Sequence, residues 1–281
     1  MRLAFFGDVV GRAGREGLAE HLPALRRALS LEFVVVNAEN AAAGFGITES
    51  TARDLFAAGA DCLTLGNHAW DQKEAMTYIL REHRLLRPLN YPPAAMAPGR
   101  GAQLFDTESG RRVLVVSPMG RVHMDALDDP FAAVDVELTA CPLGEAADAI
   151  VVDFHAEATS EKMAMGHFCD GRASLVIGTH THVPTADGQI LPGGTAYQSD
   201  AGACADYDSV IGNQKDEPLR RFTTRISSGR YKPAEGEATV CGVYLETDDA
   251  SGLAKRFEPI RVGGRLTRAV PRFEATVGQP A

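Results

Sequence analysis

The chain has 281 residues, 45% of them hydrophobic, which is enough to bury the core of one large α/β domain or of two smaller ones. Its formal net charge of -9 argues against binding of extended nucleic acid or of an anionic membrane, because such binding needs a basic face. No window of about twenty apolar residues is present, and the apolar run at 3–6 is too short for a signal peptide. We therefore expect a cytoplasmic protein with a single domain at 1–270 and a C-terminal tail at 271–281.

The five cysteines are scattered along the chain and include no Cys-x-x-Cys pair. An odd number of unpaired cysteines fits buried thiols in a reducing compartment. The sequence therefore predicts neither a disulfide framework nor a zinc site made of thiolates.

Apolar runs recur along the chain at lengths typical of buried strands. They lie at 3–6, 33–36, 62–65, 112–117, 149–155 and 175–182. Strand-helix units in the first third of the chain predict a mainly parallel sheet, whose functional edge is at the carboxyl ends of its strands. Strand-like segments at 190–197, 240–246 and 257–262 predict a second sheet that is largely antiparallel.

Three helices are predicted between the first strands. A helix that follows a loop at 11–15 has an apolar face made of Leu18, Leu22, Leu25 and Leu29. A second helix at 49–58 ends at Gly59. Asp71 and Glu74 form the pattern of a capping box, which predicts a third helix that reaches about residue 84.

Most of the apolar runs end in side chains that metal ions bind. These side chains are Asp8, Glu39, Asn67, His155, His180 and His182. Residues two apart in an extended segment point the same way, so the side chains of His180 and His182 can reach the same place. Each residue taken alone has an ordinary structural explanation, such as a helix cap for Asp8 or Glu39, or a half-buried, hydrogen-bonded histidine. Six such donors at five strand ends favour a shared metal site.

Oxygen and imidazole donors that converge in one cleft suit two divalent metal ions. Glu39 can bridge the pair, and a water held between the ions loses a proton near neutral pH and attacks phosphorus. His68 follows Asn67 directly and faces another direction in an extended chain, so we expect it to act as the general acid. Four other histidines fall within helices or loops and are expected to be structural: His21, His83, His123 and His167.

The order of these residues resembles the calcineurin-like metallophosphoesterase superfamily, whose pattern is a strand-end Asp, a bridging carboxylate, Gly-Asn-His, a lone His and His-x-His. Two differences from that pattern, Val10 in place of a histidine and Glu39 in place of the bridging Asp, match the narrower group of YmdB-like bacterial phosphodiesterases. The segments 7–12, 37–40, 178–182 and 208–212 match that group as well.

The resemblance implies a fold, a ligand set and an activity. The fold is a four-layer α/β/β/α sandwich of two mixed sheets flanked by helices. One metal ion is held by Asp8, Glu39, Asn40 and His182, and the other by Glu39, Asn67, His155 and His180. Asn40 takes the place that Val10 cannot fill, although it is equally typical of a turn. The metal is iron in some members, and the donor set also suits manganese, zinc or nickel.

We therefore predict a phosphodiesterase that acts on small phosphodiesters, such as 2',3'-cyclic or 3',5'-cyclic nucleotides. Two alternatives remain, namely a phosphomonoesterase or nucleotidase with the same centre, and a regulatory protein that binds a nucleotide or RNA end with negligible turnover. The loops at 41–47, 87–101 and 118–130 are expected to set specificity. The sequence leaves open whether the chain forms a homo-oligomer.

Overall fold

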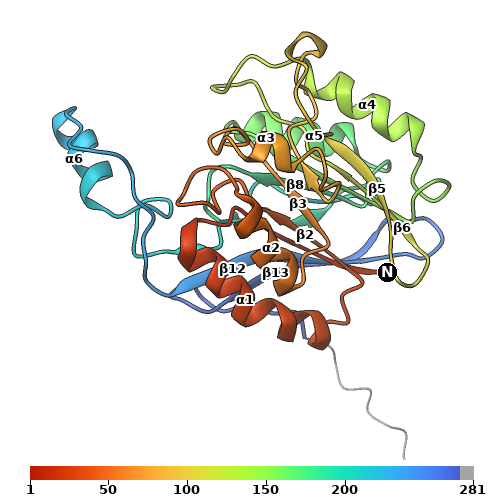
Figure 1. Ribbon diagram of the computed structural model, residues 1–281. Helices are drawn as coiled ribbons and strands as arrows, with labels where there is room; N and C mark the ends of the chain where they lie inside the picture. The colour runs from red at the N-terminus through yellow and green to blue at the C-terminus, as the bar shows by residue number, and fades with distance from the viewer. Residues whose placement is uncertain (273–281) are drawn as a thin grey trace, which may run out of the picture.

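Two mixed β-sheets lie face to face in the computed structural model, which describes residues 1–272 (Figure 1). All but two residues of the predicted tail at 271–281 lie outside this range. The first sheet consists of β1 (Arg2–Phe6), β2 (Phe33–Asn37), β3 (Cys62–Thr64), β4 (Leu85–Leu86), β11 (Ala205–Asp206), β12 (Ala238–Thr247) and β13 (Ala254–Val262). Its order is β11-β12-β1-β2-β3-β4, with β13 paired to β12. Strands β1 to β4 are parallel, and β12 runs antiparallel to β1.

The second sheet has the order β5-β6-β7-β8-β10-β9. Its strands are β5 (Ala102–Asp106), β6 (Arg112–Val116), β7 (Ala149–His155), β8 (Leu175–Thr179), β9 (Gln189–Ile190) and β10 (Ala196–Gln198). Strands β6, β7, β8 and β10 are parallel, and the two outer strands are antiparallel to their neighbours. Both sheets are thus mixed, as predicted.

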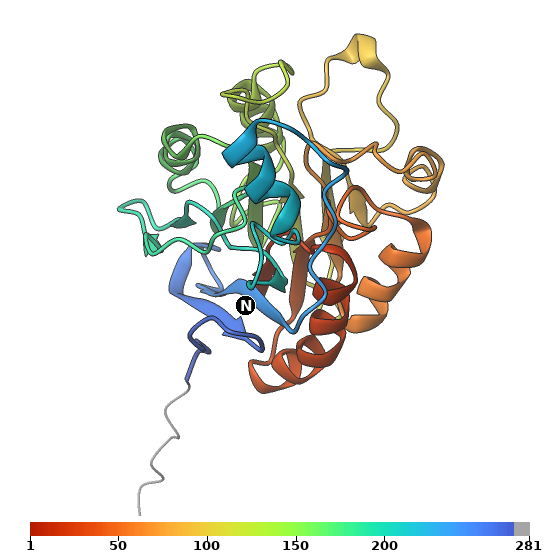
Figure 2. The same ribbon diagram turned by 90° about the vertical axis from the view of Figure 1, so that its left-hand side faces the viewer.

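Successive side chains of a strand point to opposite faces of its sheet, and this alternation produces the layers of the fold. In β1, Leu3 and Phe5 belong to a buried cluster shared with the second sheet, whereas Ala4 and Phe6 pack with the helices on the other face. The helices and the one 3-10 segment are α1 (Gly11–Ala28), α2 (Glu49–Ala58), α3 (Ala75–Tyr78), η1 (Pro93–Ala95), α4 (Pro130–Ala140), α5 (Thr159–Phe168) and α6 (Asp216–Thr224). Residues of α1 and α2 cover the first sheet, and residues of α4 and α5 cover the second (Figure 2). The predicted four-layer α/β/β/α architecture is confirmed.

The prediction of a separate antiparallel sheet late in the chain was wrong. Strands β12 and β13 join the first sheet, and β9 and β10 join the second. Strand β12 is buried along nearly its whole length because it lies between β1 and β13. A local pattern shows that such a segment is a strand but contains no information about which distant strand it pairs with.

Two details of the predicted helices also differ. Helix α1 starts directly at Gly11, so no loop precedes it at 11–15. Helix α3 spans only four residues and has no side-chain cap, so the capping box of Asp71 and Glu74 was wrong. Asp71 instead pairs with His68, and Glu74 accepts a hydrogen bond from the backbone N–H of Glu49.

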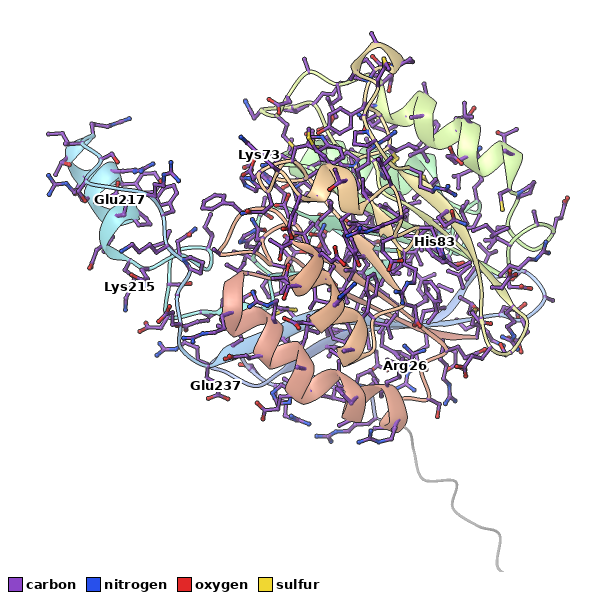
Figure 3. The ribbon with its side chains drawn as sticks, in the orientation of Figure 1. Arg26, Lys73, His83, Lys215, Glu217 and Glu237 are labelled. Carbon is purple, nitrogen blue, oxygen red and sulfur yellow. The ribbon has the colours of Figure 1, made fainter. Side chains whose placement is uncertain are left out.

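Residues 211–233, which include α6, form an arm that projects from the body (Figure 1). Lys215 and Glu217 lie on this arm, away from the two sheets (Figure 3). Neither this arm nor α4 was predicted from the sequence. Within residues 1–272, none of the helices has the length and apolar character that a membrane span requires.

Candidate metal centre and active site

The predicted ligands come from strand ends of both sheets. Asp8 and Glu39 follow β1 and β2, Asn67 follows β3, His155 ends β7 and His180 follows β8. Because parallel strands present their carboxyl ends at one edge, five separate segments deliver polar side chains to the same place. That place lies at the edge where the two sheets face each other.

The tightest group consists of Glu39, His155 and His180, each of which has a ligand atom within 4.8 Å of the other two. Nε2 of His155 lies 3.2 Å from Oε2 of Glu39 and 2.9 Å from Oδ1 of Asn67. The rings of His155 and His180 meet edge to face, with centroids 4.8 Å apart. We call Asn67, His155 and His180 the β7 side of the site.

The other predicted ligands besides Glu39 are Asp8 after β1, Asn40 after β2 and His182 after β8, and we call them the β1 side. Nε2 of His182 is 3.7 Å from Oδ2 of Asp8. Oδ1 of Asp8 and Oδ1 of Asn40 are buried and have no hydrogen-bond partner in the described part of the chain. Buried acceptors without a partner are rare and costly, and a bound cation is one way to satisfy them.

Burial and mutual charge shift the pKa values of this group strongly. Burial raises the pKa of Asp8 to about 7, although His182 and His155 oppose the shift. Burial also disfavours the charged form of Glu39, but the charge and hydrogen bond of His155 outweigh it and lower its pKa to about 2. The reverse holds for His155, whose pKa Glu39 raises to about 9 against the effect of burial. Burial and the nearby His155 lower the pKa of His180 to about 3.

Gly66 allows the β7 side to form. A Cβ atom at this position would lie 2.2 Å from Nε2 of His155 and 2.5 Å from Oε2 of Glu39. These distances are shorter than any tolerable contact, so a side chain at position 66 would displace one of the two ligands. Because glycine has no Cβ, the backbone at this strand end can approach the two ligands closely.

The segment of His180 and His182 is not extended, so the argument from strand alternation was wrong here. Strand β8 ends at Thr179, and both histidines have positive φ angles, 96° and 65°. The backbone N–H of His180 donates to Asp8, and the N–H and hydroxyl of Thr181 donate to the buried carboxylate of Asp200. These bonds hold the chain in a turn, which delivers the two rings to different sides of the site.

His68 faces the site from the segment after β3. Its backbone N–H donates to Oε2 of Glu39 at 3.2 Å, and its Nδ1 lies 2.8 Å from Oδ2 of Asp71. The rings of His68 and Phe45 pack edge to face. With Asp71 accepting the Nδ1 proton, Nε2 of His68 is the nitrogen left for a ligand or substrate.

A cavity of about 380 Å³ opens beside the β7 side. It is lined by Asn67, His123, Met124, Asp125 and His180. His123 was expected to be structural, but it is exposed in this wall and has a left-handed backbone, with φ of 60°. The loop that carries it is fixed by Glu161, which accepts hydrogen bonds from the backbone of Arg121 and Val122. The loop at 118–130 was expected to set specificity, but the sequence contained no signal for His123 itself.

The donor set fits metal ions. Carboxylate, amide and imidazole groups from both sides surround Glu39, and two of the buried oxygens have no partner among the described residues. The histidine nitrogens that do not face the cluster are also occupied. Nδ1 of His155 bonds Thr179, Nδ1 of His182 bonds the carbonyl of Ile211, and Nε2 of His180 lies 3.2 Å from Glu157. Such outer partners are typical of histidines that bind metals.

Comparisons with known proteins agree with this description. The family model described as YmdB-like protein matches residues 4–260. The 2',3'-cyclic-nucleotide 2'-phosphodiesterase of Bacillus subtilis (strain 168) is 43% identical over 262 residues, which cover 93% of this chain and 97% of the relative.

Two solved structures are similar in both sequence and fold. A hypothetical protein of Thermus thermophilus superposes with a TM-score of 0.86 at 42% identity, covering 94% of this chain and all of the other. A novel phosphatase of Mycoplasma pneumoniae superposes with a TM-score of 0.85 at 32% identity, covering 94% and 93%.

Two mixed sheets with flanking helices and a cluster of acidic, amide and imidazole donors at the strand ends define a protein of the metallophosphoesterase type. The chain belongs to the YmdB-like family.

Proposed function

We propose that the chain is a metal-dependent phosphodiesterase that hydrolyses small phosphodiesters, in the first place 2',3'-cyclic nucleotides. The observation that carries the proposal is the position of His68, whose backbone N–H donates to Glu39 of the donor cluster and whose Nδ1 lies 2.8 Å from Oδ2 of Asp71. A phosphodiester needs both elements, because an electrophilic site must hold the phosphoryl group and an acid must protonate the leaving oxygen. The 43% identity with a relative named 2',3'-cyclic-nucleotide 2'-phosphodiesterase supports the substrate class.

The residues around Glu39 suit two metal ions, one on each side. Asp8, Asn40 and His182 would hold one ion, Asn67, His155 and His180 would hold the other, and Glu39 would be shared. When bound, such ions polarise the phosphoryl oxygens and make the attacking water more acidic. Oxygen and nitrogen donors without sulfur suit iron, and equally manganese, zinc or nickel.

His68 completes the reaction by giving the proton on Nε2 to the leaving oxygen. Asp71 holds the proton on Nδ1, so the ring keeps one orientation throughout. In a 2',3'-cyclic nucleotide the leaving oxygen is a ribose hydroxyl oxygen, and the product is a nucleoside monophosphate. Transfer of this proton in the transition state contributes roughly 10²–10⁴-fold to the rate.

The cavity beside Asn67 and His180 is the proposed binding site for the nucleoside. Its volume of about 380 Å³ is in the range of pockets that bind small molecules. Asp125 can accept hydrogen bonds from ribose hydroxyls or base amino groups, and His123 can contact the phosphate or the base. Both side chains come from the loop at 118–130 that was expected to set specificity.

The test compares His68→Ala with the unchanged protein on 2',3'-cyclic AMP, on a bis-aryl phosphodiester and on the matching aryl monoester. We expect diester turnover to fall by about a hundredfold or more in the variant, while the metal content per chain stays the same. Equal turnover in the variant would refute the role of His68.

Hydrolysis of the monoester alone would favour a phosphatase, the second candidate, which the similarity to the Mycoplasma pneumoniae phosphatase supports. Tight binding of 2',3'-cyclic AMP by the metal-loaded protein without any turnover would instead indicate a regulatory binding protein.

A further inference from the structure

Four buried polar side chains lie behind His155, on the side of the ring away from Glu39. They are Asn37 at the end of β2, Thr64 at the end of β3, Asp153 in β7 and Thr179 at the end of β8. All four are fully buried, and they join the two sheets. The proposed reaction does not use any of them directly.

The orientation of Asn37 follows from its backbone neighbour. The N–H of Glu39 donates to Oδ1 of Asn37 at 3.2 Å, and a backbone N–H can only donate. The amide nitrogen of Asn37 therefore faces the opposite way, where it donates to Oδ2 of Asp153 at 2.9 Å.

Asp153 then collects donors from three strands. Its Oδ2 accepts from Asn37 and from the hydroxyl of Thr64, and its Oδ1 accepts from the hydroxyl of Thr179 at 2.7 Å. A carboxylate with three donors around it has no proton of its own to give.

These hydrogen bonds determine the direction in which the hydroxyl of Thr179 donates. The hydroxyl has one hydrogen, which it donates to Asp153, and its oxygen can only accept from other groups. Nδ1 of His155 lies 2.9 Å from this oxygen, so Nδ1 must carry a hydrogen. The amide of Asn37 is a second, longer donor to the same oxygen at 3.4 Å.

We infer that Asp153, acting through Thr179, keeps a proton on Nδ1 of His155 and so presents Nε2 as the nitrogen that binds metal. Nε2 is the atom that faces Glu39 and Asn67, at 3.2 and 2.9 Å. Asp153 and Thr179 are thus positioning residues, because neither contacts the substrate. The inference rests on the metal centre of the proposed function and is independent of the substrate.

A purely structural role would have different consequences. If Asp153 and Thr179 only held the two sheets together, removing the hydroxyl of Thr179 would lower stability without any specific effect on His155. The tautomer of His155 separates the two roles, since it depends on the direction of the hydrogen bonds.

The experiment compares Thr179→Val, which removes the hydroxyl at nearly constant volume, with Thr179→Ser, which keeps it. Zinc is the probe, because it allows nuclear magnetic resonance of ¹⁵N-labelled histidine in the loaded protein. The signal of His155 is assigned as the one lost in His155→Asn. We expect unchanged protein and Thr179→Ser to show a hydrogen on Nδ1 and metal on Nε2.

In Thr179→Val we expect the zinc affinity, measured by competition with a chelator, to fall by about 10–100-fold. The stable Nδ1 hydrogen signal should be lost as well. If Thr179→Val does not fold, Asp153→Asn replaces it, because an amide at this position opposes the donors of Asn37 and Thr179.

Zinc affinity and a His155 signal in Thr179→Val that equal those of the unchanged protein would overturn the inference. Equal losses in Thr179→Val and Thr179→Ser would overturn it too. Failure of the unchanged protein to bind zinc at all would instead contradict the proposed metal centre.

Discussion

On the β7 side of the site, His155 uses both ring nitrogens, one toward Thr179 and the other toward Asn67 and Glu39. On the β1 side, Asp8 and Asn40 each leave a buried oxygen without a partner among the described residues, and His182 stays 3.7 Å from Asp8. On the β7 side, His155 lies at the end of strand β7 and has a hydrogen-bonded layer behind its ring. The β1 side depends on loops, and the carbonyl of Ile211 at the base of the arm holds His182.

This difference between the two sides affects how each of them binds a metal ion. A side whose ligands are already fixed by other hydrogen bonds loses little entropy when it binds a cation. A side with unsatisfied buried oxygens gains most from the cation itself, since binding removes the cost of those oxygens. We therefore expect the two sides to bind metal with unequal affinity and to respond differently to substitution.

The largest effect is expected for Glu39→Gln, because this carboxylate serves both sides. We expect the metal content to fall toward zero and diester turnover to fall by about three orders of magnitude or more. Elemental analysis of the purified variant and a turnover assay measure the two effects. Glu108→Gln, an exposed carboxylate far along the chain, is the matched control and should change neither.

Gly66→Ala should disrupt the β7 side selectively. The added methyl group would overlap Nε2 of His155 and force the ring away from Glu39. We expect loss of about one metal per chain and about a hundredfold or greater loss of turnover. Gly229→Ala is the control, since a Cβ there meets nothing within 4 Å. Full metal content in Gly66→Ala would show that the close approach has no consequence for binding.

Asp8→Asn should weaken the β1 side alone and leave about one metal per chain. It should also raise the melting temperature of the metal-free protein near pH 8, because burial makes the charged form of Asp8 unfavourable and raises its pKa to about 7. Metal analysis and thermal denaturation with and without chelator test the two statements. A lower melting temperature of the metal-free variant would contradict the electrostatic part of the account.

The strands were predicted well because each depends on local order in the sequence. A buried strand that ends in a polar residue is visible in the sequence, and so is the parallel arrangement implied by strand-helix units. Non-local pairing is not visible, so β12 and β13 were assigned to the wrong sheet. The turn at 180–182 was also missed, because it depends on hydrogen bonds to Asp8 and Asp200 from distant parts of the chain.

Among the residues behind the ligands, only Asp153 had a sequence signal. It precedes His155 by two positions in a strand, so both side chains face the same way. The roles of Thr179 and of the Ile211 carbonyl depend on distances between separate segments. Asp71 was assigned to a helix cap, whereas the structure pairs it with His68.

The smallest effect is expected from pH on the metal-free protein. His155 has a pKa raised from 6.5 to about 9, so its contribution to stability is complete below about pH 6.5 and is lost as the pH rises through 9. The pKa of Asp8 is raised from 3.8 to about 7, so ionisation of Asp8 destabilises the fold. Like the loss of the proton from His155, it lowers the stability as the pH rises, in this case up to pH 7. The pKa of His180 is lowered from its ordinary value of 6.5 to about 3, so His180 causes no further change in stability above pH 6.5.

We therefore expect the melting temperature of the metal-free protein to fall between pH 7 and 9. The metal-loaded protein should not show this fall, because metal replaces the protons on these groups. Parallel thermal scans in chelator and in zinc measure the difference, and identical slopes would contradict the assignment.

The most direct test is the anomalous diffraction of a crystal of this protein soaked in manganese or zinc. The account predicts two peaks that share Glu39, one bound by Asn67, His155 and His180 and the other by Asp8, Asn40 and His182. At limiting metal, the two peaks should fill unequally. A single peak, or peaks away from Glu39, would contradict the two-sided centre.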